Sequence, residues 1–121
     1  MKGNVQIYSA GKQAADISAF PEGIAVAVGS EEDVPDICPD QTIDKVFTIE
    51  NLTSFYRFKQ EHSLVIYLGG YHNHSRRNLL MQIYQKLPDA QYYHFGDLDA
   101  GGFYILEHLK RKTGIPFQMF N

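Results

Sequence analysis

Three carboxylates at the ends of apolar runs are the side chains in this sequence best suited to chemistry. Glu50 closes the run Val46–Glu50, and Asp97 and Asp99 follow the run Gln91–Phe95. In an extended segment, side chains at i and i+2 point the same way, so Asp97 and Asp99 share a side. Acids that converge repel one another unless a cation binds between them. Mg²⁺ prefers oxygen ligands, commonly one or two carboxylates together with substrate phosphates, so we expect a divalent-metal site suited to phosphoryl chemistry.

A plainer interpretation of the same residues needs no metal. Asp97 could cap a loop, Asp99 could be the N-cap of the next helix, and Glu50 could be solvated. For an isolated D-x-D this interpretation is the commoner one. If Glu50 ends a neighbouring strand, three carboxylates converge on one edge, and this placement favours the metal site here.

The elements that would position these acids alternate regularly from Lys45 onward. The expected strands are Val46–Glu50, Ser63–Leu68, Gln91–Phe95 and Pro116–Phe120, and the expected helices lie within Asn51–Glu61, from Ser75 to Leu87 and from about Phe103 to Lys112. Such alternation implies parallel pairing through right-handed crossovers, and ligands bind at the carboxyl ends of such strands. We therefore predict an α/β fold with a mostly parallel sheet and helices on both faces.

Residues 1–44 differ from the rest in charge and pattern. They carry two basic and eight acidic residues, whereas residues 45–121 carry nine basic and six acidic ones. We expect 1–44 to be an acidic lead-in of uncertain structure, with possible strands at Val5–Tyr8 and Ile24–Val28 and a loop at Ser30–Gln41. We expect 45–121 to be the functional domain, with its C-terminal part incomplete. If a metal offsets three of its acids, nine bases face three acids, which suits a phosphate backbone.

Several function classes find no support in the sequence. No apolar run reaches the roughly 18–20 residues of a membrane span, and the N-terminus has no secretory signal. Cys38 is the only cysteine, and neither a Walker phosphate loop nor a dinucleotide fingerprint occurs. We expect a cytoplasmic protein with no membrane partner.

A second group of residues could contact phosphate or DNA, each with an ordinary alternative. Glycines after a strand or at a helix start can expose backbone N–H groups, but they also serve tight turns or close packing. Arginines at a helix start oppose the helix dipole, which makes a phosphate contact worth testing against a solvated basic face. A loop histidine could bind DNA or simply be solvated. This group comprises Gly69, Gly70, His72, Arg76, Arg77 and Gly102.

The motifs in this order resemble a known family. Residues 47–55 resemble an E-N-x-x-[ST]-F motif, Leu68–Tyr71 a small-residue turn, and residues 94–106 a G-D-x-D-x-x-G-[FL]-x-I-L motif. Together they resemble the Toprim domain, a Rossmann-like fold. Within that group they are similar to the C-terminal domain of the Wadjet plasmid-defence subunit JetD, a relative of the topoisomerase VI A subunit. The resemblance covers roughly residues 45–120, and Gly101 departs from it where a larger residue is usual.

The resemblance implies a magnesium- or manganese-dependent DNA endonuclease. Glu50, Asp97 and Asp99 would be the metal ligands, with Glu50 also a candidate general base or acid. Cleavage would use metal-activated water, because the tyrosine-bearing winged-helix domain of the topoisomerases does not fit in 121 residues. The resemblance further implies a homodimer in the full-length form that works with an SMC-like complex. Activity of this piece alone is doubtful.

Two other functions stay open. A Toprim-like module could recruit DNA or partner subunits without catalysis, which the short chain and its acidic first segment would allow. A flavodoxin-like regulatory domain with a phosphorylatable aspartate would also place acids at strand ends. It needs a lysine after a late strand facing the site, and the late lysines here lie at a helix end instead.

Overall fold

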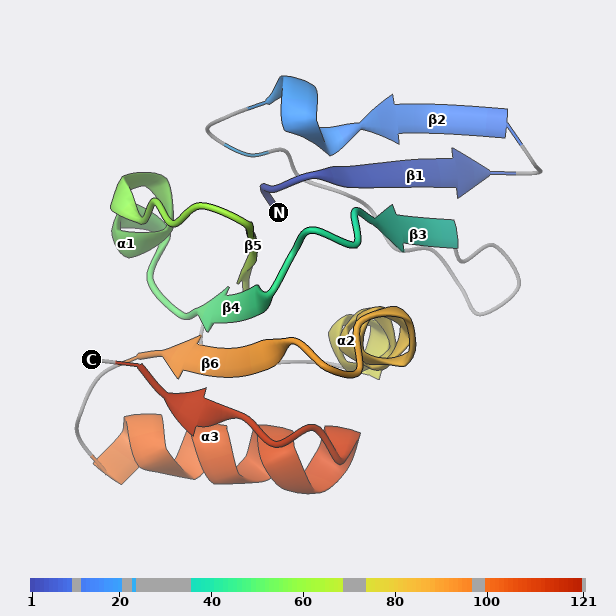
Figure 1. Cartoon of the computed structure of the whole chain (residues 1–121). Coiled ribbons are helices and arrows are strands. Elements are labelled where there is room, and N and C mark those ends of the chain that lie inside the picture. The colour runs from blue at the N-terminus through green and yellow to red at the C-terminus, as the bar shows by residue number, and fades with distance from the viewer. Residues whose placement is uncertain (10–11, 21–22, 24–35, 69–73, 97–99, 121) are drawn as a thin grey trace.

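The structure, a computed structural model, contains two β-sheets and three α-helices in the part of the chain that it describes. That part comprises residues 1–9, 12–20, 23, 36–68, 74–96 and 100–120 (Figure 1). One sheet is antiparallel and comes from the first 39 residues, and the other is parallel and comes from residues 45–119.

The parallel sheet has the strand order β5-β4-β6-β7. Its strands are β4 (Lys45–Ile49), β5 (Ser63–Tyr67), β6 (Gln91–Phe95) and β7 (Gln118–Met119). All three pairings are parallel, and Ile49 lies opposite both Tyr67 and Phe95. The predicted α/β class and the parallel sheet are therefore confirmed, and three strands end together at one edge.

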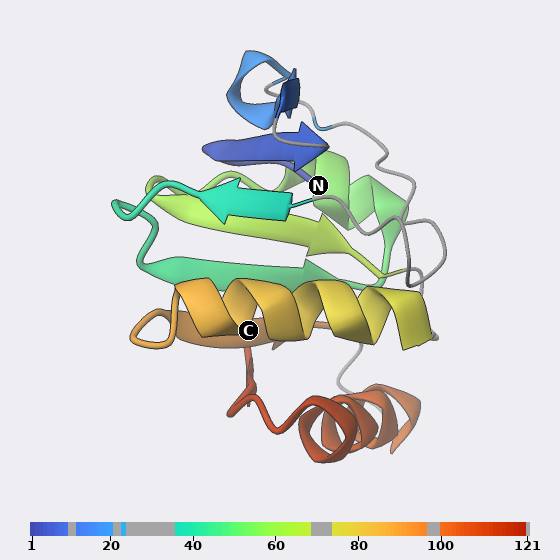
Figure 2. The same cartoon turned by 90° about the vertical axis from the view of Figure 1, so that its right-hand side faces the viewer.

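The helices cover both faces of this sheet. They are α1 (Leu52–Arg57), α2 (His74–Lys86) and α3 (Ala100–Thr113). Apolar residues of α2 and α3 join one core cluster with the strands, whereas Phe55 of α1 joins a second cluster with Phe47 and Ile49. Figure 2 shows α2 in front of the strands and running along them, with α1 behind.

The helix predictions are correct in place but not in their ends. Leu79, Leu80 and Ile83 of α2 are buried, and so is Leu87, which follows the helix. Ser75 does not cap this helix, because the helix already begins at His74. Helix α3 begins at Ala100, earlier than expected, and leaves Phe103 48% exposed rather than in the core. Helix α1 fills only the first half of Asn51–Glu61.

The first segment forms a sheet of its own, in the order β2-β1-β3. Its elements are β1 (Val5–Ser9), β2 (Lys12–Asp16), the 3₁₀ turn η1 (Ile17–Ala19) and β3 (Asp36–Pro39). The strand predicted at Val5–Tyr8 is confirmed, and Ile24–Val28 lies outside the described residues. The loop predicted over Ser30–Gln41 is wrong at β3, where Ile37 pairs with Ile7 and is completely buried.

This antiparallel sheet shares its core with the parallel one. Val5, Ile7 and Ile37 belong to the same buried cluster as Leu80 and Ile83 of α2. Lys86 at the end of α2 pairs with Asp36 of β3 and donates to the carbonyl of Ile37 at 2.5 Å. The acidic first segment is therefore packed against the domain that carries Glu50.

Candidate functional site

Glu50 stands at the centre of the carboxyl edge of the parallel sheet. It directly follows β4, which lies between β5 and β6. Its N–H donates to the carbonyl oxygen of Phe95 at 3.3 Å, and the N–H of Leu68 donates to Ile49 at 2.8 Å. These bonds hold the ends of three strands side by side around Glu50.

The residue after Glu50 turns the chain away from the edge. Asn51 is the N-cap of α1, and its side-chain oxygen accepts from the N–H of Ser54 at 3.1 Å. An Asn at this position satisfies a helix N–H that would otherwise lack a partner. The residues of the E-N-x-x-S segment therefore have a structural role in the local chain: the strand ends at Ile49, and a helix capped by Asn51 begins at Leu52.

Gly96 makes the room that the Glu50 carboxylate occupies. A Cβ built on Gly96 would lie 2.7 Å from both Cδ and Oε1 of Glu50 and 3.0 Å from Oε2. Contacts that short are not tolerated, so any side chain at this position would displace the carboxylate. The carboxylate therefore lies over the residue that immediately precedes Asp97.

A buried histidine holds the carboxylate from one side. His94 Nε2 lies 2.7 Å from Oε1 of Glu50, and His94 Nδ1 lies 2.7 Å from the hydroxyl oxygen of Thr48. Thr48 and His94 are register partners on β4 and β6, and Glu50 is two residues beyond Thr48 on the same side. We call Thr48, His94 and Glu50 the polar triad.

The role of His94 is not evident from the sequence alone. Its contact with Glu50 depends on the parallel pairing of Thr48 with His94, which a single sequence does not display. The available signal was position: Thr48 and His94 are each the second-last residue of their strands, which end at Ile49 and Phe95. Aligned strand ends would bring the two side chains together.

The surroundings of Glu50 do not fit a solvated surface acid. Its side chain is 12% exposed, and that of His94 is 0% exposed. Among the described residues, no lysine or arginine forms an ion pair with Glu50. Burying a carboxylate is costly unless charge or hydrogen bonds compensate. The oxygen donors of Glu50, the space over Gly96 and the absence of a lysine or arginine partner among the described residues together fit a carboxylate that receives a hard cation.

The other two predicted ligands cannot be placed. Asp97 and Asp99 lie outside the described residues. Residues 1–9, 12–20, 23, 36–68, 74–96 and 100–120 contain no group of three His, Cys, Asp or Glu side chains that could hold a metal. Of the proposed metal site, the structure therefore gives the position of Glu50 and of the end of β6, the strand that precedes Asp97 in the sequence.

The predicted phosphate-binding residues divide in the same way. Gly69, Gly70 and His72 lie outside the described residues. Arg76 and Arg77 are in the first turn of α2, and a guanidinium N–H of Arg76 donates to the carbonyl oxygen of Leu68. Leu68 follows the end of β5, so Arg76 is tied to the edge that carries Glu50. Gly102 lies buried inside the first turn of α3, not ahead of it.

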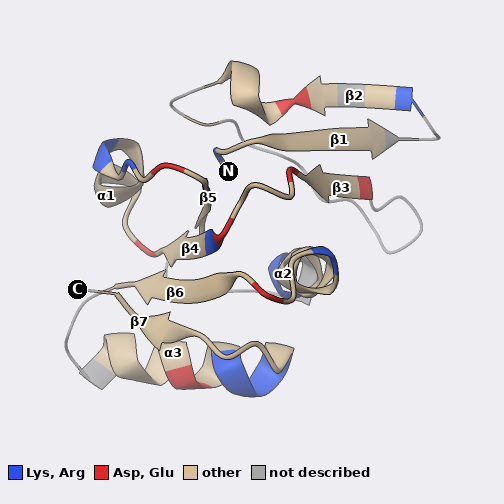
Figure 3. Cartoon of the chain, in the orientation of Figure 1, with Lys and Arg blue, Asp and Glu red and all other residues tan. Residues whose placement is uncertain are grey.

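The positive charges of Arg77 on α2 and of Arg111 and Lys112 on α3 act on His108. The pKa of His108 is lowered, first by its partial burial and then by the positive charges of Arg111, Lys112 and Arg77. Figure 3 shows the basic residues of α3 as one band at the end of that helix. We call Arg77, His108, Arg111 and Lys112 the basic cluster. It supplies positive potential that a polyanion could meet.

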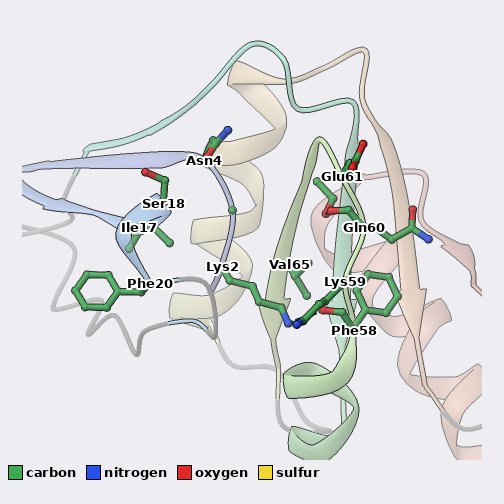
Figure 4. A pocket seen from close by; sticks show the side chains of 12 residues that line it. Lys2, Asn4, Ile17, Ser18, Phe20, Phe58, Lys59, Gln60, Glu61 and Val65 are labelled. Atoms are coloured by element: carbon green, nitrogen blue, oxygen red, sulfur yellow. Dashed lines mark hydrogen bonds between the residues drawn. The ribbon is translucent and has the colours of Figure 1, made fainter.

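A cavity of about 400 Å³ lies away from this edge, between the first segment and the residues after α1. Lys2, Ile17, Phe20 and Phe58 are among the residues that line it (Figure 4). Glu50 and His94 are not among its lining residues. Within the part of the chain that the structure describes, no helix is both long enough and apolar enough to span a membrane.

Comparison with known proteins identifies related sequences. The sequence profile of the family described as Wadjet protein JetD, C-terminal, matches residues 30–119. A curated relative, Wadjet protein JetD from Bacillus cereus (strain Q1), is 34% identical over 127 aligned residues. That alignment takes in 98% of this chain and 30% of the relative, so the chain spans less than a third of the relative's length. No solved structure matches.

Proposed function

Because this chain belongs to the C-terminal family of the Wadjet protein JetD, we propose that it carries the metal-dependent DNA-cleaving centre of a plasmid-defence nuclease. The observation that carries the proposal is the position of the Glu50 carboxylate. A largely buried carboxylate lies over Gly96, at the point where the chain runs on to Asp97-Leu98-Asp99. The proposal includes the Toprim assignment and the relation to the topoisomerase VI A subunit.

The residues available would suit Mg²⁺ or Mn²⁺. Glu50, Asp97 and Asp99 offer only oxygen donors, which hard divalent cations prefer. When bound, such an ion polarises a phosphate and lowers the pKa of a coordinated water. The sequence order places the pair of aspartates directly after the glycine that seats Glu50.

The chain's own groups would do the remaining work. Arg76, tied to the carbonyl of Leu68 at the same edge, would pair with a phosphate oxygen through its planar set of N–H donors. Gly69, Gly70, His72 and Gly102 remain proposed phosphate contacts. Glu50 would accept or return a proton on the attacking water, in the role of general base or acid.

The assembly is part of the proposal as well. The family name points to work with other Wadjet subunits, and the resemblance of the sequence to JetD adds a homodimer and an SMC-like complex. DNA is the proposed substrate, and the basic cluster supports contact with its phosphates. Because the chain spans 30% of its relative, cleavage is proposed for the full-length protein within its complex.

A non-catalytic module is the second candidate. The basic cluster on α2 and α3 favours it, because it could recruit DNA or a partner subunit without any metal. Binding of Mn²⁺ separates the two functions. A catalytic centre needs the cation at Glu50, whereas a recruiting module does not.

The decisive experiment is a pair of matched substitutions in the full-length protein assembled with its partner subunits. Glu50→Gln keeps the size of the side chain and removes its charge, so Mg²⁺-dependent DNA cleavage should be abolished. Glu61→Gln makes the same change at an exposed turn residue and should leave cleavage intact. Asp97→Ala should behave like Glu50→Gln. Cleavage by Glu50→Gln at the wild-type rate would refute the catalytic assignment.

A further inference from the structure

We infer that His94 is a positioning residue for Glu50, an inference that rests on the proposed metal site. Its imidazole holds one carboxylate oxygen, so that the other is kept ready for the cation. The clearest observation is the pair of 2.7 Å contacts that His94 makes, one to Oε1 of Glu50 and one to the hydroxyl of Thr48.

The direction of the first hydrogen bond follows from the chemistry of its partners. A carboxylate oxygen accepts hydrogen bonds, so the N–H group at Nε2 of His94 is the donor and Oε1 of Glu50 is the acceptor. Glu50 makes no other side-chain hydrogen bond among the described residues. Oε1 is thus committed to His94, and Oε2 is the oxygen left to a ligand.

Thr48 fixes the orientation of the imidazole from the far side. With Nε2 on the carboxylate, Nδ1 of His94 meets the Thr48 hydroxyl, and both ring nitrogens are engaged. A ring held at both nitrogens cannot turn away or flip without losing a hydrogen bond in a fully buried place. The fixed imidazole in turn orients the Glu50 carboxylate through its hydrogen bond to Oε1. The carboxylate also lies against the backbone of Gly96, where a side chain would collide with it.

A role in packing alone does not account for the polar triad. Thr48 and His94 are both 0% exposed, and the neighbours of Thr48 on β4, Phe47 and Ile49, are buried apolar residues. Apolar side chains of the same shape would fill this space without the need to satisfy three polar groups. Within the triad, Thr48 and His94 are buried in the sheet, and only the Glu50 carboxylate is partly exposed. Side chains that orient a metal ligand in this way typically change metal affinity by about 10–100-fold when they are replaced.

The test compares two amides at His94 by calorimetry with Mn²⁺, on the whole 121-residue chain. The side-chain NH₂ of Gln reaches the place of Nε2, whereas that of the shorter Asn reaches only the place of Nδ1. His94→Gln should stay within about threefold of the wild-type affinity, and His94→Asn should lose about 10–100-fold. Both variants put an amide into the same buried position, so a merely structural role would affect them alike.

Folding is checked for each variant by circular dichroism and urea unfolding. If either His94 variant is unfolded, Thr48→Val takes its place, because it keeps the shape and removes only the hydroxyl that orients the ring. It should weaken Mn²⁺ binding, and unchanged affinity would overturn the inference.

The outcomes separate this inference from the proposed function. If the wild type binds Mn²⁺, Glu50→Gln does not, and the two folded His94 variants bind equally, then the metal site stands and the positioning role is refuted. If the wild type binds no Mn²⁺, the proposed function fails, and the inference that rests on it fails with it.

Discussion

The carboxylate of Glu50 and the backbone of Gly96 occupy touching positions on neighbouring strand ends. The two residues are 46 positions apart in the sequence, yet a single added methyl on Gly96 would lie 2.7 Å from Glu50 Cδ. The backbone of Gly96 does not adopt a positive φ. Glycine is therefore needed here for space rather than for conformation.

Gly96→Ala should weaken Mn²⁺ binding as well as stability. The added methyl forces the carboxylate or the strand end to move. Because the carboxylate is the far end of a flexible side chain, the loss of stability should lie at the lower end of the about 1–3 kcal/mol that is typical of overpacking. Urea unfolding measures the stability, and calorimetry measures the Mn²⁺ affinity.

Gly114→Ala is the matched control for that substitution. Gly114 has φ +72° and nothing within 4 Å of an added Cβ, so alanine there costs about 1–2 kcal/mol through the backbone alone. Its Mn²⁺ affinity should equal that of the wild type. If both variants bound the metal equally, the cradle over Gly96 would have no part in the site.

Lys2→Met should lower the stability of the chain. The Lys2 ammonium is buried, donates to the carbonyls of Phe55 at 2.5 Å and Phe58 at 2.6 Å, and lies 4.8 Å from the centre of the Phe55 ring. Figure 4 shows this side chain reaching towards Phe58. Methionine keeps the apolar stem but leaves two carbonyls at the end of α1 without this donor.

We expect a net loss of about 1–3 kcal/mol in the free energy of unfolding for Lys2→Met, since the methionine also avoids the desolvation of an ammonium group. A helix of six residues is not stable by itself, so α1 depends on such contacts. Lys12→Met, at an exposed position of β2, should change the stability by no more than about 0.5 kcal/mol. Equal effects of the two substitutions would show that Lys2 contributes nothing specific.

The sequence was sufficient for the parallel sheet but not for the first segment. Val46–Glu50, Ser63–Leu68 and Gln91–Phe95 are apolar runs bounded by turn residues, and each forms a strand within one residue of its expected ends. The strand Asp36–Pro39 was not predicted, because the two prolines and several acids of residues 30–41 indicated a loop and the strand contains only one aliphatic residue, Ile37. Ile37 is buried only because β1 and α2 lie against it, which is a tertiary effect.

The candidate site shows the same division. That Glu50 would stand at the carboxyl edge followed from parallel pairing, whereas its place beside the end of β6 depends on the strand order β5-β4-β6, which the sequence alone does not display. The contact with His94 depends on the register of Thr48 against His94, and the seat on Gly96 depends on which way the carboxylate turns. Both are set by packing between segments more than 40 residues apart, which local pattern does not encode.

The ion pair between Asp36 and Lys86 should make the junction of the two sheets sensitive to acid. The hydrogen bond from Lys86, with its positive charge, lowers the pKa of the Asp36 carboxyl below its usual 3.8. The folded chain therefore binds this proton more weakly than the unfolded chain does. The stabilisation is fully present above about pH 4 and is lost as the pH falls through the lowered pKa.

Asp36→Asn tests this by urea unfolding at a series of pH values. The variant should be less stable than the wild type at neutral pH, by an amount typical of an exposed pair, and the difference should shrink towards pH 3. Asp89→Asn, which removes an exposed carboxylate from the turn before β6, is the control. A stability difference for Asp36→Asn that stays constant down to pH 3 would rule out the ion pair as its source.

His108 should report the arrival of DNA at the basic cluster. In the free protein, burial and the charges of Arg111, Lys112 and Arg77 lower the pKa of His108. Phosphates that pair with these cations would offset their charge, so the pKa of His108 should rise when a short duplex binds. Titration of the His108 ring proton by NMR, with and without the duplex, measures this. In the DNA-free protein, Arg111→Gln should shift the pKa in the same direction, because it removes one of the three charges. If the duplex bound while the pKa of His108 stayed unchanged, the DNA would contact another face of the domain.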